Sequence, residues 1–157
     1  KNDAPLDFDL SAVTAQSRDN PVWYVQYAHA RCNSLSRMIA SQMPRLDISY
    51  LSLKTSKFEL LKEKSEIDLI KLMAGWPRLI EASATAKEPH RIAFYLNDLA
   101  SAFHSLWTQG KESPSLRFMI EDDPELTRAR VALVSALQMV IASGLELLGI
   151  KPLEEMR

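Results

Sequence analysis

The sequence has few of the residues that mark several classes of protein. Its single cysteine, Cys32, excludes an internal disulfide and favours a reducing compartment such as the cytoplasm. Its four glycines stand apart from one another, so they form no glycine-rich phosphate loop. No stretch approaches the ~18 consecutive apolar residues that cross a membrane. We therefore expect a soluble protein with no membrane partner.

The chain also lacks an excess of either charge, since 19 Lys and Arg stand against 20 Asp and Glu. A net charge of −1 exerts no long-range attraction on phosphates, so we expect no DNA partner, and any RNA contact must be local. The 157 residues, 46% of them hydrophobic, are enough for one domain with one core. The start at Lys1, with neither a methionine nor a signal peptide, indicates a fragment or a processed chain.

The first strong helical pattern begins at Asn20-Pro21. Asparagine is a favoured N-cap residue, and proline is favoured in the first helical turn. Apolar residues then recur at spacings of three and four up to Pro44, which predicts a long amphipathic helix. The apolar stripe consists of Val25, Ala28, Cys32, Leu35 and Ile39.

The middle of the chain is less regular. Residues 45–64 are predicted to form a basic loop with a short helix around residues 58–62. Ser65, with Asp68 three residues later, predicts a capped helix start, and Pro77 should kink or restart that helix. A further amphipathic helix is expected over residues 89–110. Its stripe consists of Ile92, Leu96, Leu99, Phe103 and Leu106.

The last helix is apolar around most of its girth, which is typical of a helix at the centre of a bundle. Asp123 should cap it, and Gly149 and Pro152 should end it. We predict an all-α fold, a bundle of about four to five helices. Residues 1–19, which include a short apolar and acidic alternation, are expected to be an extended lead-in to a helical domain over residues 20–157.

Familiar catalytic and metal-binding patterns are absent from the sequence. His29 and Cys32 lie one helical turn apart, but His90 and His104 are dispersed, so no four-ligand zinc site is expected. The acidic residues 121–123 precede a helix start, where negative charge is favoured as a cap. We expect no catalytic residue and no metal ligand in this chain.

Tyr27 and Arg31 are the unusual pair. At ~100° per residue, they lie about 120° and 80° from the centre of the first stripe, one turn apart on one flank. An aromatic ring and a guanidinium so placed can hold an unpaired base, a stack worth ~1–3 kcal/mol. The alternative is an aromatic rim that packs the bundle, with Arg31 reaching to solvent.

A resemblance to a known family distinguishes these readings. The run Asn-Pro-Val-Trp-Tyr-Val-Gln-Tyr-Ala-His-Ala-Arg at residues 20–31 resembles the segment that opens the C-terminal anticodon-binding, or DALR-type, domain of arginyl-tRNA synthetases. Other blocks resemble the same family in the same order: residues 6–10, 95–103, 129–134, 144–149 and the near-terminal Met156. The resemblance therefore covers essentially the whole chain.

The resemblance implies that this chain binds the anticodon loop of tRNA(Arg). The RNA-binding residues would be Tyr27, Arg31, Tyr95 and Met156. The full enzyme would ligate arginine to this tRNA with ATP and Mg²⁺, in a catalytic domain of the same chain against which this domain packs. The His-x-Gly-His and Lys-Met-Ser-Lys type motifs of that domain are absent, and Lys-Thr-Ser-Lys at residues 54–57 lacks its partner motif. The fragment alone should therefore bind RNA without catalysis.

Two other classes of protein fit an all-α pattern. A non-catalytic helical adaptor or sensor bundle would have no need of the ordered blocks and would not bind RNA. A cofactor-binding bundle enzyme would need inward carboxylates and a Glu-x-x-His pair, which the sequence does not contain.

Overall fold

The computed structural model describes residues 10–17 and 19–156, and all regular structure in this part of the chain is helical. This confirms the predicted all-α class. Five helices of eleven or more residues form the bundle: α2 (Pro21–Gln42), α4 (Lys64–Ala74), α5 (Trp76–Ala86), α6 (His90–Glu112) and α7 (Pro124–Leu147). The shorter elements are α1 (Leu10–Thr14), α3 (Tyr50–Lys54) and the 3₁₀ turns η1 (Phe58–Leu60) and η2 (Pro114–Leu116).

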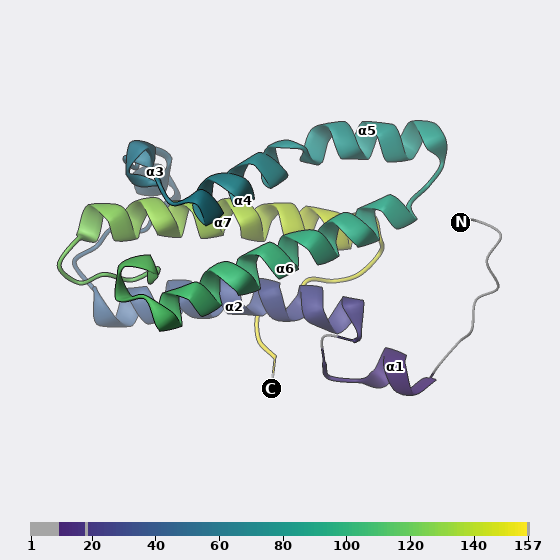
Figure 1. The fold of residues 1–157 in the computed structure, drawn as a ribbon, viewed down its shortest axis with the longest axis horizontal. Coiled ribbons are helices and arrows are strands. Elements are labelled where there is room, and N and C mark those ends of the chain that lie inside the picture. Colours follow the sequence, from purple (N-terminus) through teal and green to yellow (C-terminus); the bar gives the residue numbers. More distant parts are fainter. Residues whose placement is uncertain (1–9, 18, 157) are drawn as a thin grey trace.

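Helix α7 is the central helix, as its apolar girth predicted. It contacts α2, α6, α4 and α3 (Figure 1), and Leu137 and Ile141 are fully buried within it. By length and composition α7 is also long and apolar enough to cross a membrane, although its sequence contains no unbroken apolar run of that length. Half of its most apolar stretch is buried against the other helices, as expected for a core helix.

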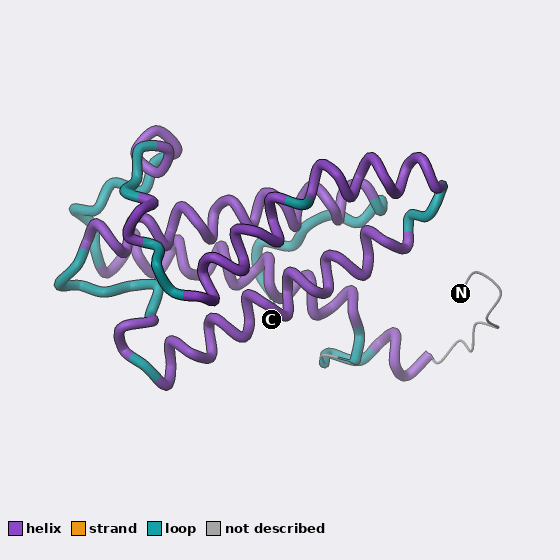
Figure 2. The backbone as a smooth tube through the Cα atoms, turned by 45° about the horizontal axis from the view of Figure 1, so that its top comes forward, coloured by secondary structure: helices purple, strands orange, loops and turns teal. Residues whose placement is uncertain are grey.

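Helices α2 and α6 pack on each other and on α7, and their predicted stripes are buried. The Asn20 side chain accepts a hydrogen bond from the Trp23 backbone N–H (3.2 Å), which confirms the predicted N-cap of α2. Asp123 caps α7 in the same way, through the N–H of Leu126 (2.9 Å). The restart at Pro77 is also confirmed, because α4 ends at Ala74 and α5 begins at Trp76 (Figure 2).

Three local predictions were wrong. The lead-in was expected to be extended over residues 1–19, but it contains the helix α1. In α1 the Thr14 hydroxyl donates to the Leu10 carbonyl (2.8 Å). Residues 1–9 lie outside the described part of the chain. Within residues 45–64, α3 was missed because its signal is a local cap, Ser49 accepting from the N–H of Ser52 (3.4 Å), and not an apolar period.

The start of α4 also differs from the prediction. The cap is Glu63 and not Ser65, because the Glu63 backbone N–H donates to the Glu66 carboxylate (3.1 Å). The same carboxylate is buried against Arg130 of α7, with Nε and Oε1 2.6 Å apart. The helix therefore begins at a local capping box of two glutamates, and one of them also pairs with a residue 64 positions away.

The Glu66–Arg130 ion pair is a polar tie inside the apolar core. Both residues are almost fully buried, with 1% and 3% of their surface exposed. The Arg130 Nη1 also donates to the backbone carbonyls of Ser115 and Arg117, each at 2.7 Å. The pair thus joins α4 and α7 to the loop that follows α6.

Candidate nucleic-acid interface

The guanidinium of Arg31 lies between two aromatic rings. Its Cζ is 4.5 Å from the centroid of Tyr27 and 4.7 Å from the indole of Trp107 on α6. Nη2 donates to the Tyr27 hydroxyl (2.6 Å) and Nη1 to Nδ1 of His104 (3.1 Å). The structure therefore brings Tyr27 and Arg31 together, as their one-turn spacing predicted, and adds two partners from α6.

His104 fixes the orientation of this guanidinium. Arginine has only donors, so Nδ1 of His104 must accept, and the imidazole proton is then on Nε2, 3.5 Å from the Tyr24 carbonyl. The His104 ring also stacks on Tyr27 (centroids 5.2 Å apart), and Trp23 stacks on Tyr27 as well (5.0 Å). The Tyr27 and Arg31 side chains are thus held in place before any ligand arrives.

A hollow of about 400 Å³ opens beside this cluster. Its lining includes Tyr27, Arg31, Ser34, Trp107 and Met156, with Arg37 and Glu155 also contributing. Trp107 was not predicted from the sequence, where its only signal is an aromatic residue next to the buried stripe position Leu106. The hollow combines aromatic surface, a thioether and a guanidinium, which suits a flat polar ring.

The C-terminal tail reaches the hollow because buried polar groups of α2 hold its backbone. The Gln26 amide donates to the Lys151 carbonyl (2.9 Å) and accepts from the N–H of Leu153 (2.8 Å). His29 Nδ1 donates to the Leu153 carbonyl (2.7 Å). These bonds direct the tail across α2 (Figure 1) and bring Met156 to the hollow. Three of the four predicted RNA-binding residues therefore share one site.

Tyr95, the fourth predicted residue, does not line this hollow. Its ring is buried and stacks on Trp76 of α5 (centroids 5.3 Å apart), and its hydroxyl donates to the Leu72 carbonyl (2.8 Å). Burial raises the pKa of Tyr95 to about 12. The geometry gives Tyr95 a packing position between α4, α5 and α6, and its role in RNA binding stays a prediction.

Removing the Tyr95 hydroxyl should leave the Leu72 carbonyl without this donor. Tyr95→Phe is expected to lower the free energy of unfolding by ~0.5–1.5 kcal/mol near neutral pH. An unfolded tyrosine loses its proton near pH 10, whereas the folded one keeps it to about 12, so the wild type should lose stability between these values. Urea titrations at several alkaline pH values should show a flatter decline for Tyr95→Phe, and parallel declines would contradict this.

Cys32 takes no part in the site. It is fully buried in α2, and burial raises the pKa of its thiol to about 12, so little of the reactive thiolate is present near neutral pH. His29, the other member of the pair considered for a metal, uses Nδ1 on the tail carbonyl of Leu153. Both residues are therefore accounted for by packing and by the position of the tail.

Comparisons with known proteins find a matching family and similar chains. The sequence model of the DALR anticodon binding domain family matches residues 25–156. Arginine–tRNA ligases of Beijerinckia indica and Parvibaculum lavamentivorans are each 55% identical over 157 residues, which is all of this chain and 27% of each relative. The chain thus spans about a quarter of the length of these curated relatives.

A solved structure shares the fold. The crystal structure of a putative arginyl-tRNA synthetase from Campylobacter jejuni matches 99% of this chain and 31% of its own, with a TM-score of 0.78 and 22% sequence identity. The arrangement of helices around the hollow is therefore one that a longer chain also contains.

Proposed function

Because the chain belongs to the DALR anticodon-binding domain family, we propose that it is the part of an arginine–tRNA ligase that binds the anticodon loop of tRNA(Arg). The observation that supports this most strongly is the hollow at Arg31, where Tyr27, Trp107 and Met156 supply flat or polarizable surface beside an oriented cation. An unpaired base needs both kinds of contact.

The base to be read is the middle one of the anticodon, which is cytosine for every arginine codon. Cytosine offers an amino donor at N4 and acceptors at N3 and O2. Arg31 has five N–H donors, of which one bonds Tyr27 and one bonds His104, so three are left for N3, O2 or a neighbouring phosphate. Tyr27, Trp107 and Met156, which line the hollow, would supply the flat or polarizable surface around the base.

The chemistry of the ligase belongs to the part of the relatives that this chain does not match. We propose that ATP and Mg²⁺ activate arginine in that catalytic domain, that this domain packs on it within the same chain, and that the enzyme works in the cytoplasm. The names of the 55% identical relatives and the quarter of their length that the chain spans support this division.

A binding measurement tests the proposal. The chain should bind an RNA hairpin with an arginine anticodon, and replacing the middle C by U should weaken binding about 5- to 150-fold, since one base contact discriminates by ~1–3 kcal/mol. Both hairpins must be compared at one salt concentration. No binding at all would favour the helical adaptor or sensor instead. Equal affinity for the two hairpins would mean that the chain binds RNA without reading the middle base.

One carboxylate at the hollow, that of Glu155, should repel the phosphates of RNA. Glu155 pairs with Arg37 (3.5 Å), and both side chains are about half exposed. Glu155→Gln should remove a negative charge near the phosphates and release Arg37, raising RNA affinity about 1.4- to 5-fold, the ~0.2–1 kcal/mol typical of an exposed pair. Glu154→Gln, one residue away and outside the lining of the hollow, is the matched control; an equal gain there would mean that only net charge matters.

A further inference from the structure

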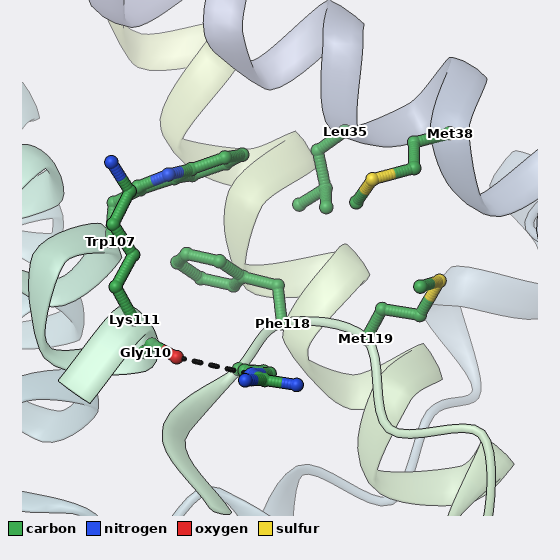
Figure 3. A pocket seen from close by; sticks show the side chains of 8 residues that line it. Leu35, Met38, Trp107, Gly110, Lys111, Phe118 and Met119 are labelled. Atoms are coloured by element: carbon green, nitrogen blue, oxygen red, sulfur yellow. Dashed lines mark hydrogen bonds between the residues drawn. The ribbon is translucent and has the colours of Figure 1, made fainter. Parts of the chain in front are cut away.

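A second hollow lies against the first, with Trp107 as a common wall. It has a volume of about 370 Å³, within the ~300–1,000 Å³ of small-molecule sites. Figure 3 shows it between α2, the end of α6 and the loop after α6. Its apolar lining consists of Leu35, Met38, Trp107, Phe118 and Met119.

The loop that forms one side of this hollow is held in place by several contacts. Phe118 is buried and contacts the Trp107 ring (centroids 5.5 Å apart). The loop before it is held by Arg130, which binds the carbonyls of Ser115 and Arg117. The loop also passes so close to Gly110 that an added Cβ would lie 3.0 Å from a loop carbonyl oxygen. The hollow is therefore a feature of the packed fold.

Two cations complete the lining. Lys111 and Arg117 are exposed, and neither forms an ion pair with any residue in the described part of the chain. The Arg117 side chain donates a 3.4 Å bond to the Gly110 carbonyl. Together with Arg31 and Arg37, four cations line the two hollows, against the single carboxylate of Glu155. This local excess stands out in a chain whose net charge is −1.

We infer that the second hollow holds a nucleotide next to the middle anticodon base in the same RNA strand. Its base would lie among Trp107, Phe118 and the two methionines, and its phosphate would contact Lys111 and Arg117. An apolar wall with unpaired cations at its edge matches the two parts of a nucleotide. Because Trp107 lines both hollows, the two sites are close enough for neighbouring nucleotides of one strand. The inference rests on the proposed binding of the anticodon loop.

The experiment uses the 157-residue chain and three hairpins: the arginine anticodon hairpin, and two copies in which the nucleotide on the 5′ or the 3′ side of the middle C is abasic. Met38→Trp fills the hollow and should weaken binding of the intact hairpin about 5- to 150-fold, the value of one base stack. It should have little further effect on one of the two abasic hairpins, because contacts to one base are not additive.

A second variant tests the phosphate contacts by removing two exposed cations. Lys111→Ala with Arg117→Ala should reduce the slope of log affinity against log salt by about 1.4, that is ~0.7 for each lost contact on a single strand. Arg78→Ala, an exposed arginine of α5, is the control and should leave the slope nearly unchanged. Thermal midpoints close to that of the wild type would show that the variants are folded.

The outcomes separate this inference from the proposed function. If the wild type does not prefer the hairpin with a middle C, the proposed function fails. If the wild type does prefer that hairpin, but both variants bind like the wild type, the second hollow does not bind RNA. The inference is then overturned, and the hollow would instead suit an apolar group of another partner. If Met38→Trp weakens all three hairpins equally, no base enters the hollow, and the inference is overturned.

Discussion

Replacing Arg130 by methionine while Glu66 remains should lower the free energy of unfolding by about 3–5 kcal/mol. Both side chains are almost fully buried, so the change leaves a carboxylate inside the bundle without its cation. It also removes the donor from the carbonyls of Ser115 and Arg117, and a buried unpaired acceptor costs ~1–3 kcal/mol. Urea unfolding at neutral pH measures the loss.

The matched control replaces both charges. Glu66→Leu combined with Arg130→Met removes the stranded carboxylate, so its cost should be well below that of Arg130→Met alone, since apolar pairs often substitute for buried ion pairs without loss. A double variant that is as unstable as the single one would locate the effect in the loop carbonyls and in the cap of α4, which loses its Glu66 acceptor. A loss below about 0.5 kcal/mol for Arg130→Met, the range of surface changes, would contradict the buried geometry.

This ion pair also shows what the sequence could and could not predict. The helices α2, α6 and α7 were predictable because their signals are local: Asn20-Pro21 and Asp123-Pro124 are caps within one turn, and the apolar stripes repeat at helical spacing. The start of α4 was misplaced, because its capping box uses two glutamates, Glu63 and Glu66, and not the serine on which the prediction relied. The pairing of Glu66 with Arg130, 64 positions away, leaves no local pattern in the sequence.

The site divides in the same way. The Tyr27–Arg31 contact follows from their spacing on one helix, and it was predicted. Trp107 joins them only because α6 packs beside α2, and Met156 arrives only because Gln26 binds the tail more than 120 residues later in the chain. Tyr95 is buried because Trp76 stacks on it from α5, a contact between helices that periodicity does not specify.

Replacing Arg31 by alanine should weaken binding of the arginine anticodon hairpin about 10- to 150-fold, because hydrogen bonds from a charged donor are worth ~1.5–3 kcal/mol. Arg31→Lys should also bind weakly, although it keeps the charge, since an ammonium cannot reproduce the planar fork that bonds Tyr27 and His104 at the same time. Fluorescence anisotropy with a labelled hairpin measures both variants, and Arg78→Ala on α5 controls for the loss of one positive charge.

The identity of the contacted base is the sharper part of this prediction. If Arg31 faces the middle cytosine, changing that base to U should cost the wild type much affinity and cost Arg31→Ala little more, because the two changes remove the same contacts. Full additivity would mean that Arg31 binds a phosphate and that the base is read elsewhere in the hollow. Because Arg31 also lies against Tyr27 and Trp107, the thermal midpoint of Arg31→Ala must be measured alongside. A large fall in that midpoint together with weak binding would favour the alternative in which this cluster only packs the bundle.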